Sequence, residues 1–199
     1  RDPRCGRLFE GYSEDPCVVK SLAPSFVRGV QDTGVVANVK HFAANNQETE
    51  RMGVNEHIGE RALRELYLPG FKACVDAGCK TLMSSYNQIN GYPSSQNPWL
   101  LRKVLREEWG FKGFVMSDWG GVYNRVAAQK AGNDVCMPGP RAISELKAAV
   151  ASGELSMAQI DEACENYLNI MLEMPILKGR RYTSIDCEHS LAAAYDAAK

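Results

Sequence analysis

The chain has 199 residues, a formal net charge of −1 and no basic stripe, so we do not expect nucleic acid as a partner. Apolar residues make up 45% and charged residues 24%, which is typical of a globular domain with a substantial core. No run of about 18 apolar residues occurs, so no membrane-spanning helix is expected.

The cysteines argue against a disulfide scaffold. Their count is odd and their spacing is irregular, and no cluster of histidines accompanies them, so a zinc site is not expected either. We interpret them as reduced thiols, which favours a cytoplasmic setting, although the count is also compatible with a secreted protein. The seven are Cys5, Cys17, Cys74, Cys79, Cys136, Cys164 and Cys187.

The first half of the chain alternates helices with strands. A Pro in the first helical turn, a Gly at a helix end and apolar residues at helical spacing mark the boundaries. In chain order we expect a charged loop, a helix, a strand, a polar loop and a helix kinked at Pro69, over residues 1–16, 16–34, 35–42, 45–51 and 59–76.

The second half continues the alternation. We expect strands over 80–87, 113–116 and 133–138, and helices over 97–110, around 126–127, over 141–152 and over 156–175. The last of these helices opens with Ser156 and Gln159 at the spacing of a capping box. Basic, irregular residues and an Ala-rich end follow.

Strands that alternate with helices predict a parallel sheet in an α/β fold. The pattern is that of a (β/α)8 TIM-barrel-like fold, but a complete barrel needs roughly 250 residues and eight strands. Only four strands are visible here, so the sequence predicts a partial barrel that belongs to a larger molecule.

The most informative stretch runs from Gly113 to Gly121. A short apolar strand ends in Ser117, Asp118 and Trp119 and is followed by two glycines. The carboxyl ends of barrel strands carry the chemistry, so Asp118 is a candidate catalytic carboxylate. The alternative is that Asp118 only caps the next helix, because Asp is a favoured N-cap residue.

Other strand ends and loops are also polar or aromatic. They supply Lys40, His41, Tyr86 and Trp119, and charged loops add Arg7 and Arg51. Paired hydrogen bonds to hydroxyls and stacking on ring faces are typical of sugar-binding clefts. The alternatives are a satisfied polar pair at 40–41 and a core role for Trp119.

The motifs together resemble those of glycoside hydrolase family 3, most of all its β-glucosidases, over nearly the whole chain. The matching segments are Arg1-Asp2-Pro3-Arg4, Gly6-Arg7, Phe9-Glu10, Ser13-Glu14-Asp15-Pro16, Lys40-His41-Phe42, Met83-Ser84-Ser85-Tyr86-Asn87, Asn90-Gly91, Ser117-Asp118-Trp119, Ala131-Gly132-Asn133-Asp134 and Met137-Pro138-Gly139.

The resemblance implies a role for each candidate residue. Asp118 matches the family's nucleophile and Trp119 a residue that lines the sugar subsite. Lys40 and His41 match a pair that grips sugar hydroxyls. Arginines that bind sugar or brace the nucleophile correspond to Arg7 and Arg51, and a tyrosine near the nucleophile corresponds to Tyr86.

The implied activity is that of a retaining exo-acting β-glycosidase, most simply a β-glucosidase, with no metal or organic cofactor. The nucleophile must be ionised, which neighbouring Arg and Lys charges favour. The family's general acid/base usually comes from a second domain. We therefore expect residues 1–176 to be part of the barrel, residues 177–199 to be a linker, and the rest of the enzyme or a second chain to be a partner.

Three alternatives remain open from the sequence. The chain could be an inactive or sugar-binding fragment that needs a second polypeptide. It could belong to a β-xylosidase of the same family. It could also be a Schiff-base aldolase that uses Lys40, which would require that lysine to lie in a fairly apolar pocket.

Overall fold

The central sheet has three parallel strands in the order β1-β3-β6. A computed structural model of the chain describes residues 2–139, 142–175, 177–179 and 187–198. The strands are β1 (Asn38–Phe42), β3 (Thr81–Ser84) and β6 (Phe114–Ser117). Both pairings are parallel, which confirms the predicted α/β architecture.

The predicted strand over 133–138 is wrong. Val135 makes only an isolated parallel bridge to Met116. The backbone N–H groups of Asp134 and Val135 both donate to the Val115 carbonyl, at 2.9 and 3.0 Å, so a regular ladder cannot continue there.

Two other strands were predicted too wide, and the strand predicted over 113–116 is displaced by one residue, since β6 is Phe114–Ser117. β1 begins at Asn38 rather than Val35, because Val35 lies in an exposed connection. β3 ends at Ser84, and the residues after it form loops.

The helices follow the predicted order. The long helix over 59–76 is interrupted at Leu68, and its last part begins at Pro69 as predicted. Ser156 and Gln159 form the predicted capping box. The helical segments are η1 (Leu8–Glu10), α1 (Pro16–Asp32), α2 (Glu60–Ala62), η2 (Leu63–Tyr67), α3 (Pro69–Asp76), η3 (Ser94–Gln96), η4 (Trp99–Glu108), α4 (Arg125–Ala131), α5 (Ile143–Ala151), α6 (Met157–Glu173) and α7 (Cys187–Ala197).

A second, smaller sheet lies beside the first and was not predicted. It contains β2 (Asn55–Glu56), β4 (Gln88–Ile89) and β5 (Tyr92–Pro93), in the order β2-β4-β5. The Asn90-Gly91 turn joins β4 to β5, and both turn residues have positive φ. The Asn90 side chain accepts from the Ile58 N–H and donates to the Ile58 carbonyl, which ties the turn to the loop after β2.

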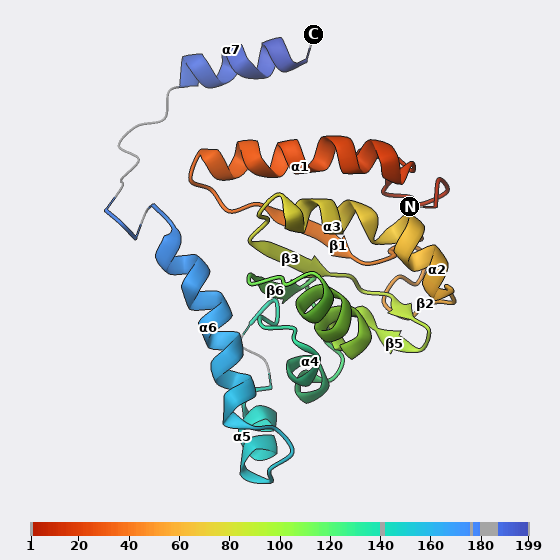
Figure 1. Cartoon of the computed structure of the whole chain (residues 1–199), viewed down its shortest axis with the longest axis vertical. Helices are drawn as coiled ribbons and strands as arrows, with labels where there is room; N and C mark the ends of the chain where they lie inside the picture. Colours follow the sequence, from red (N-terminus) through yellow and green to blue (C-terminus); the bar gives the residue numbers. More distant parts are fainter. Residues whose placement is uncertain (1, 140–141, 176, 180–186, 199) are drawn as a thin grey trace.

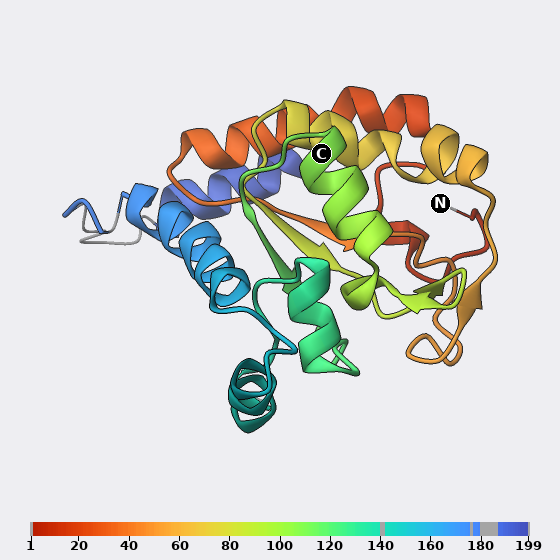
Figure 2. The same ribbon diagram turned by 60° about the horizontal axis from the view of Figure 1, so that its bottom comes forward.

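The core lies between the central sheet and the helices on one side of it. In Figure 1, α1 and α3 lie together above the strands, whereas α4 and α5 lie below them, and Figure 2 shows the strands enclosed between these groups. The fully buried core side chains come from the strands, η2 and η4, and they include Phe42, Leu63, Leu82, Leu100, Leu101, Val104, Leu105 and Val115.

Gly113 marks the close approach of two backbones at the start of β6. A Cβ atom at this position would collide with the Lys80 carbonyl and with the ring of Phe111. Only glycine fits there, which places β6 directly against the segment that enters β3.

The outer edge of β1 is open. Among the described residues, β1 pairs only with β3. A groove of about 410 Å³ lies between β1 and α1, and its lining includes Val27, Val30, Val36 and Phe26. The Phe26 side chain is 62% exposed. This edge is what a partial barrel would leave uncovered.

The C-terminal part stands apart from this body. In Figure 1, α7 is separated from the other helices, and its described side chains are exposed. Residues 176, 180–186 and 199 lie outside the described residues, so the predicted domain boundary at 176 and about a third of the predicted linker cannot be compared with the fold. That division of the chain stays a prediction.

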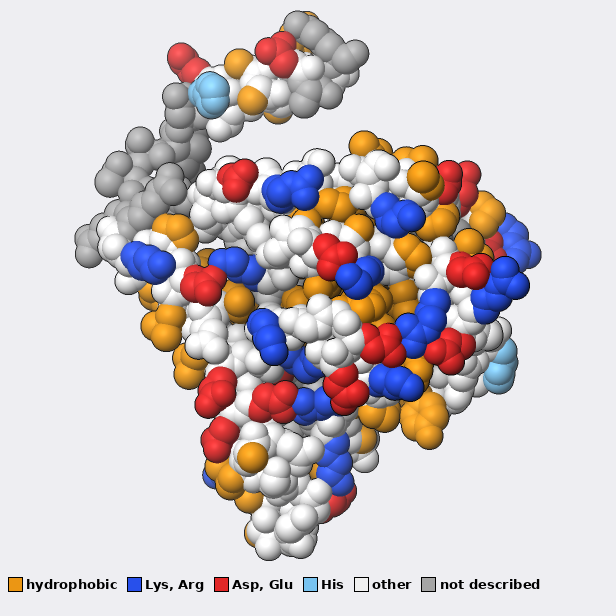
Figure 3. All heavy atoms as spheres, in the orientation of Figure 1, with side chains coloured by type: hydrophobic (Ala, Val, Ile, Leu, Met, Phe, Trp, Pro, Cys, Tyr) orange, Lys and Arg blue, Asp and Glu red, His pale blue; other side chains and the backbone are white. Residues whose placement is uncertain are grey.

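The charged surface and the cysteines agree with the expectations from the sequence. Acidic and basic side chains are interspersed on the face shown in Figure 3. The cysteines whose side chains are described are free thiols. Within the described ranges, no helix is both long and apolar enough to cross a membrane.

Candidate active site

Three strand ends bring the candidate residues to one edge of the sheet. Phe42 pairs with Ser84, and Ser84 pairs with Ser117, so the three strands finish level with one another. The ladder continues one residue further, because the Ser85 N–H donates to the Phe42 carbonyl and the Asp118 N–H donates to the Ser84 carbonyl. His41, Tyr86 and Asp118 are neighbours for this reason.

The Asp118 carboxylate is the centre of the cluster. It is largely buried, and Oδ1 accepts a 2.7 Å hydrogen bond from the N–H of Trp119. Oδ2 lies 3.4 Å from His41 Nε2. Asp118 does not cap the next helix, because the side chain of Asn124 caps α4 by accepting from the Ala127 N–H.

His41 and Arg7 connect to the cluster from β1 and from the N-terminal loop. His41 is buried, and its Nε2 lies 3.3 Å from Arg7 Nη1. Arg7 also pairs with Glu10 at 2.6 Å. The Arg7 guanidinium is thus linked to the Asp118 carboxylate through the His41 ring.

Tyr86 and Arg51 lie on another side of the carboxylate. The Arg51 guanidinium lies 4.6 Å from the centroid of the Tyr86 ring and pairs with Glu48 at 2.8 Å. The Tyr86 hydroxyl donates to the Trp119 carbonyl at 2.9 Å. Burial and the negative charge of Asp118 raise the pKa of Tyr86, so its hydroxyl stays a donor well into the alkaline range.

Exposed groups surround the mouth of the cluster. The side chain of Trp119 is 52% exposed, so it is not a core residue. Lys40 is exposed in the middle of β1. An exposed aromatic face next to a buried carboxylate is typical of a sugar site.

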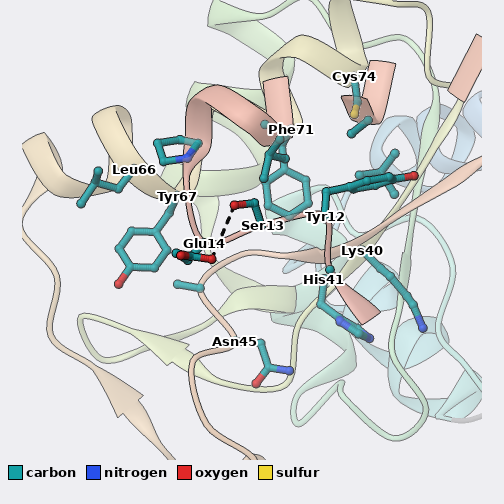
Figure 4. A pocket seen from close by; sticks show the side chains of 17 residues that line it. Tyr12, Ser13, Glu14, Lys40, His41, Asn45, Leu66, Tyr67, Phe71 and Cys74 are labelled. Atoms are coloured by element: carbon teal, nitrogen blue, oxygen red, sulfur yellow. Dashed lines mark hydrogen bonds between the residues drawn. The ribbon is translucent and has the colours of Figure 1, made fainter. Parts of the chain in front are cut away.

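A small cavity lies behind these residues rather than over Asp118. It measures about 140 Å³ and is lined by Lys40 and His41 together with apolar residues of α1 and α3. Figure 4 shows Phe71, Tyr67 and Tyr12 around this pocket, with Lys40 and His41 extending away from Phe71. Asp118 and Trp119 do not line it, so we place the candidate active site at the strand ends and not in this cavity.

Two residues of the site were missed by the sequence analysis. Burial and the charge of Asp118 raise the pKa of Tyr123, whose hydroxyl donates to the Tyr86 carbonyl at 3.0 Å. Glu48 bridges Arg51 and Asn45. A polar loop over 45–51 was visible in the sequence, whereas nothing in the periodicity around residue 123 distinguishes that tyrosine.

No group of three His, Cys, Asp or Glu side chains among the described residues lies close enough to hold a metal ion. The donors around Asp118 are instead those that bind hydroxyl groups and stabilise a carboxylate.

A parallel sheet in an α/β fold with polar side chains at its carboxyl edge is typical of the enzymes built on β/α barrels. Residues 1–170 match the family model described as "Glycosyl hydrolase family 3 N terminal domain", so the chain belongs to glycosyl hydrolase family 3. This result confirms the family and the partial (β/α)8 barrel expected from the sequence motifs.

Named relatives agree with the family. The chain is 47% identical over 178 residues to "Beta-glucosidase B" of Emericella nidulans, which covers 87% of this chain and 21% of the relative. It is 46% identical over 187 residues to an "Exo-alpha-(1->6)-L-arabinopyranosidase" of Bifidobacterium longum, covering 94% of this chain and 24% of the relative.

Solved structures agree with the fold. The structure of beta-glucosidase 3B from Thermotoga neapolitana in complex with glucose superposes with a TM-score of 0.93 at 50% sequence identity, covering 99% of this chain and 29% of that one. The chain thus spans only between about a fifth and a third of the length of these relatives, and the activity of the whole protein is a matter of proposal.

Proposed function

We propose that the enzyme to which this chain belongs is a retaining exo-acting β-glycosidase, first of all a β-glucosidase, and that Asp118 is its nucleophile. The carrying observation is the buried Asp118 carboxylate at the end of β6, with His41 Nε2 at 3.4 Å and an exposed Trp119 beside it. The names of the most similar relatives support the activity.

The proposed reaction has two displacements. Asp118 attacks the anomeric carbon of the terminal sugar, the bond to the leaving group breaks, and a glycosyl-enzyme ester forms. Water then attacks the same carbon and frees the sugar and the Asp118 carboxylate. The proton for the leaving group comes from an acid that we place in the rest of the enzyme, because a retaining pair needs a second carboxyl about 5–5.5 Å away.

The surrounding residues have distinct proposed roles. Lys40 and His41 bind sugar hydroxyls, and Arg7 adds positive charge through its contact with His41. Trp119 provides a face for the sugar ring. Tyr86 and Arg51 brace the segment that follows β6. Hydrogen bonds to the sugar strengthen as its ring distorts, so these contacts favour the transition state over the bound substrate.

The sugar preference is a separate question. The Bifidobacterium relatives are named as arabinopyranosidases, so a pyranoside other than glucose is a second candidate. Comparing kcat/KM on aryl β-glucoside, aryl β-xyloside and aryl α-L-arabinopyranoside would rank the three. The highest value on the glucoside is expected.

The nucleophile is tested by trapping. A fluorinated glucoside with a good leaving group forms the ester but releases it slowly, and mass spectrometry of the digested enzyme should find the sugar on the peptide that contains Asp118. Asp118→Gly should lose turnover by on the order of 10³-fold or more while remaining folded. Label on another residue, or near-normal turnover of the variant, would reject the assignment.

The aldolase alternative has little support. A Schiff-base lysine needs an apolar pocket that depresses its pKa, whereas Lys40 is exposed in β1. We further propose a reducing compartment for the enzyme, because the cysteines with described side chains are free and several of them are buried.

A further inference from the structure

The segment that carries the proposed nucleophile is tied to a neighbouring loop by side-chain hydrogen bonds. We call residues 118–124 the nucleophile loop and residues 85–96 the supporting loop. Backbone bonds join the nucleophile loop to β3 at Asp118 and to Met137 at Gly120. Between the two loops, the Asn124 N–H donates to Gln96 Oε1, and three side chains donate to backbone carbonyl groups, namely Tyr86, Ser95 and Tyr123.

Ser95 makes the shortest of these contacts. Its side chain is fully buried, and its hydroxyl donates to the Gly121 carbonyl at 2.6 Å. Gly121 in turn donates its N–H to the Asp118 carbonyl at 2.9 Å, closing a tight turn. Holding the Gly121 carbonyl therefore fixes the turn that begins at Asp118.

Tyr123 acts in the opposite direction between the same loops. Its hydroxyl donates to the Tyr86 carbonyl, while the Tyr86 hydroxyl donates to the Trp119 carbonyl. The Tyr86 ring also packs against Gly121, where a Cβ atom would lie 3.3 Å from Tyr86 Cδ1. The two loops are thus joined at Trp119, Gly121 and Tyr123, directly after Asp118.

We propose that Ser95 and Tyr123 are positioning residues for the reaction on Asp118. Neither needs to touch the sugar: each holds a carbonyl group and thereby keeps the carboxylate and the Trp119 face in one geometry. This inference rests on the proposed function of Asp118. A misplacement of about 1 Å at a reacting group can cost on the order of 10²-fold in rate, so loosening this loop should lower kcat more than it raises KM.

Ser94 offers a matched control for Ser95. Both serines are fully buried and adjacent in η3, and both donate a hydroxyl to a carbonyl. The Ser94 bond, 2.9 Å to Asn87, stays within the supporting loop, whereas the Ser95 bond crosses to the nucleophile loop. Ser94→Ala and Ser95→Ala remove the same atom, and the Asn87 carbonyl keeps its 3.0 Å hydrogen bond from the Ser94 N–H.

The experiment measures kcat and KM of the complete enzyme on an aryl β-glucoside, with hydrogen exchange of its peptides. We expect Ser95→Ala to lower kcat about tenfold to a hundredfold with KM changed less than threefold, and to raise exchange over residues 118–124. Ser94→Ala should keep kcat within about threefold of wild type and leave exchange of that segment unchanged. Equal kinetic effects of the two variants would overturn the proposal.

A second variant covers the case in which Ser95→Ala does not fold. Tyr123→Phe removes only a hydroxyl from a half-exposed ring, and we expect it to lower kcat about threefold to tenfold with little change in KM. Wild-type kcat in this variant would overturn the role of Tyr123. Asp118→Gly, measured alongside, separates the two claims, because an active Asp118→Gly enzyme rejects the proposed function itself, whereas an inactive one leaves only the positioning roles at stake.

Discussion

The two edges of the central sheet are supported very differently. At the β6 edge, Val115 is fully buried, and its N–H donates to the Asp134 carboxylate at 2.7 Å. The same carboxylate pairs with Arg106 at 2.6 Å. At the β1 edge, the strand faces a groove of about 410 Å³. Asp118 follows the supported strand, β6, and Lys40 lies within the open one, β1. The chain thus holds the proposed nucleophile by its own contacts, whereas it leaves part of the sugar-binding set to be enclosed by other segments.

The largest effect on solubility and activity should come from expressing the chain alone, with the open β1 edge uncovered. We expect residues 1–199 expressed alone to be poorly soluble or associated with another polypeptide, and not to hydrolyse cellobiose. An unpaired strand edge invites pairing, and without an acid only good leaving groups depart. Light scattering and a cellobiose assay on the purified chain, with the complete enzyme as control, test both expectations. A soluble, active monomer would contradict them and would direct mutagenesis to Glu10, Glu14, Glu48 and Glu50.

Removing the support of the β6 edge should have the next largest effect. Burial raises the pKa of Asp134 in spite of its pairing with Arg106, which shows how far this ion pair is removed from water. Asp134→Ala leaves Arg106 buried without its carboxylate, and we expect it to destabilise the complete enzyme by about 3–5 kcal/mol in urea unfolding. Asp161→Ala, at an exposed position of α6, should change stability by less than about 0.5 kcal/mol. Similar losses in the two variants would contradict the contrast between the edges.

Lys40 and His41 are adjacent in β1, but Lys40 is exposed and His41 is buried. Alanine substitutions at the two positions should therefore have different effects on activity and stability. Lys40→Ala should lower kcat/KM by an amount that corresponds to a loss of about 1.5–3 kcal/mol in transition-state stabilisation. Thermal stability should not change, because Lys40 is exposed and its proposed contact is with the sugar. His41→Ala should lower both, since His41 is buried between Arg7 and Asp118. Lys112→Ala is an exposed control. Wild-type kinetics in both variants would count against a sugar-binding role.

The smallest effect concerns alkaline pH. The pKa values of Tyr86 and Tyr123 are raised above the ordinary 10.0 by burial and by the charge of Asp118. The unfolded chain therefore ionises first. The stabilisation from the two protonated hydroxyls is complete below pH 10.0 and is lost as pH rises through the folded-state values. Tyr86→Phe with Tyr123→Phe should flatten the fall of stability above pH 10.0, whereas Tyr92→Phe, at an exposed position, should not. Equal slopes in all variants would disprove the coupling.

The sequence predicted the structure best where a short run of residues determines the local backbone conformation by itself. The apolar run before Asp118 predicted β6, Pro69 predicted the break before α3, and Ser156 with Gln159 predicted the start of α6. Parallel pairing then brings the strand ends together, which is why residues as distant as His41, Tyr86 and Asp118 could be grouped in advance.

Contacts between loops could not be predicted in this way. The strands β2, β4 and β5 have two residues each, too few for any periodicity to register. The predicted strand at Val135 failed because Asp134 turns to bond Val115 and Arg106, a buried pairing that no local pattern encodes. Ser95 and Tyr123 matter only through the carbonyl groups that they reach across space.

Substitutions at Gly113, at the opposite end of β6 from Asp118, should also impair the active site. Because a side chain there would collide with the Lys80 carbonyl, a substitution must push β6 away from the segment that leads into β3. Asp118 lies at the other end of the same short strand and would move with it. In a screen for lost activity, changes at Gly113 should therefore be recovered together with changes at Asp118, although a residue at position 113 never meets the sugar.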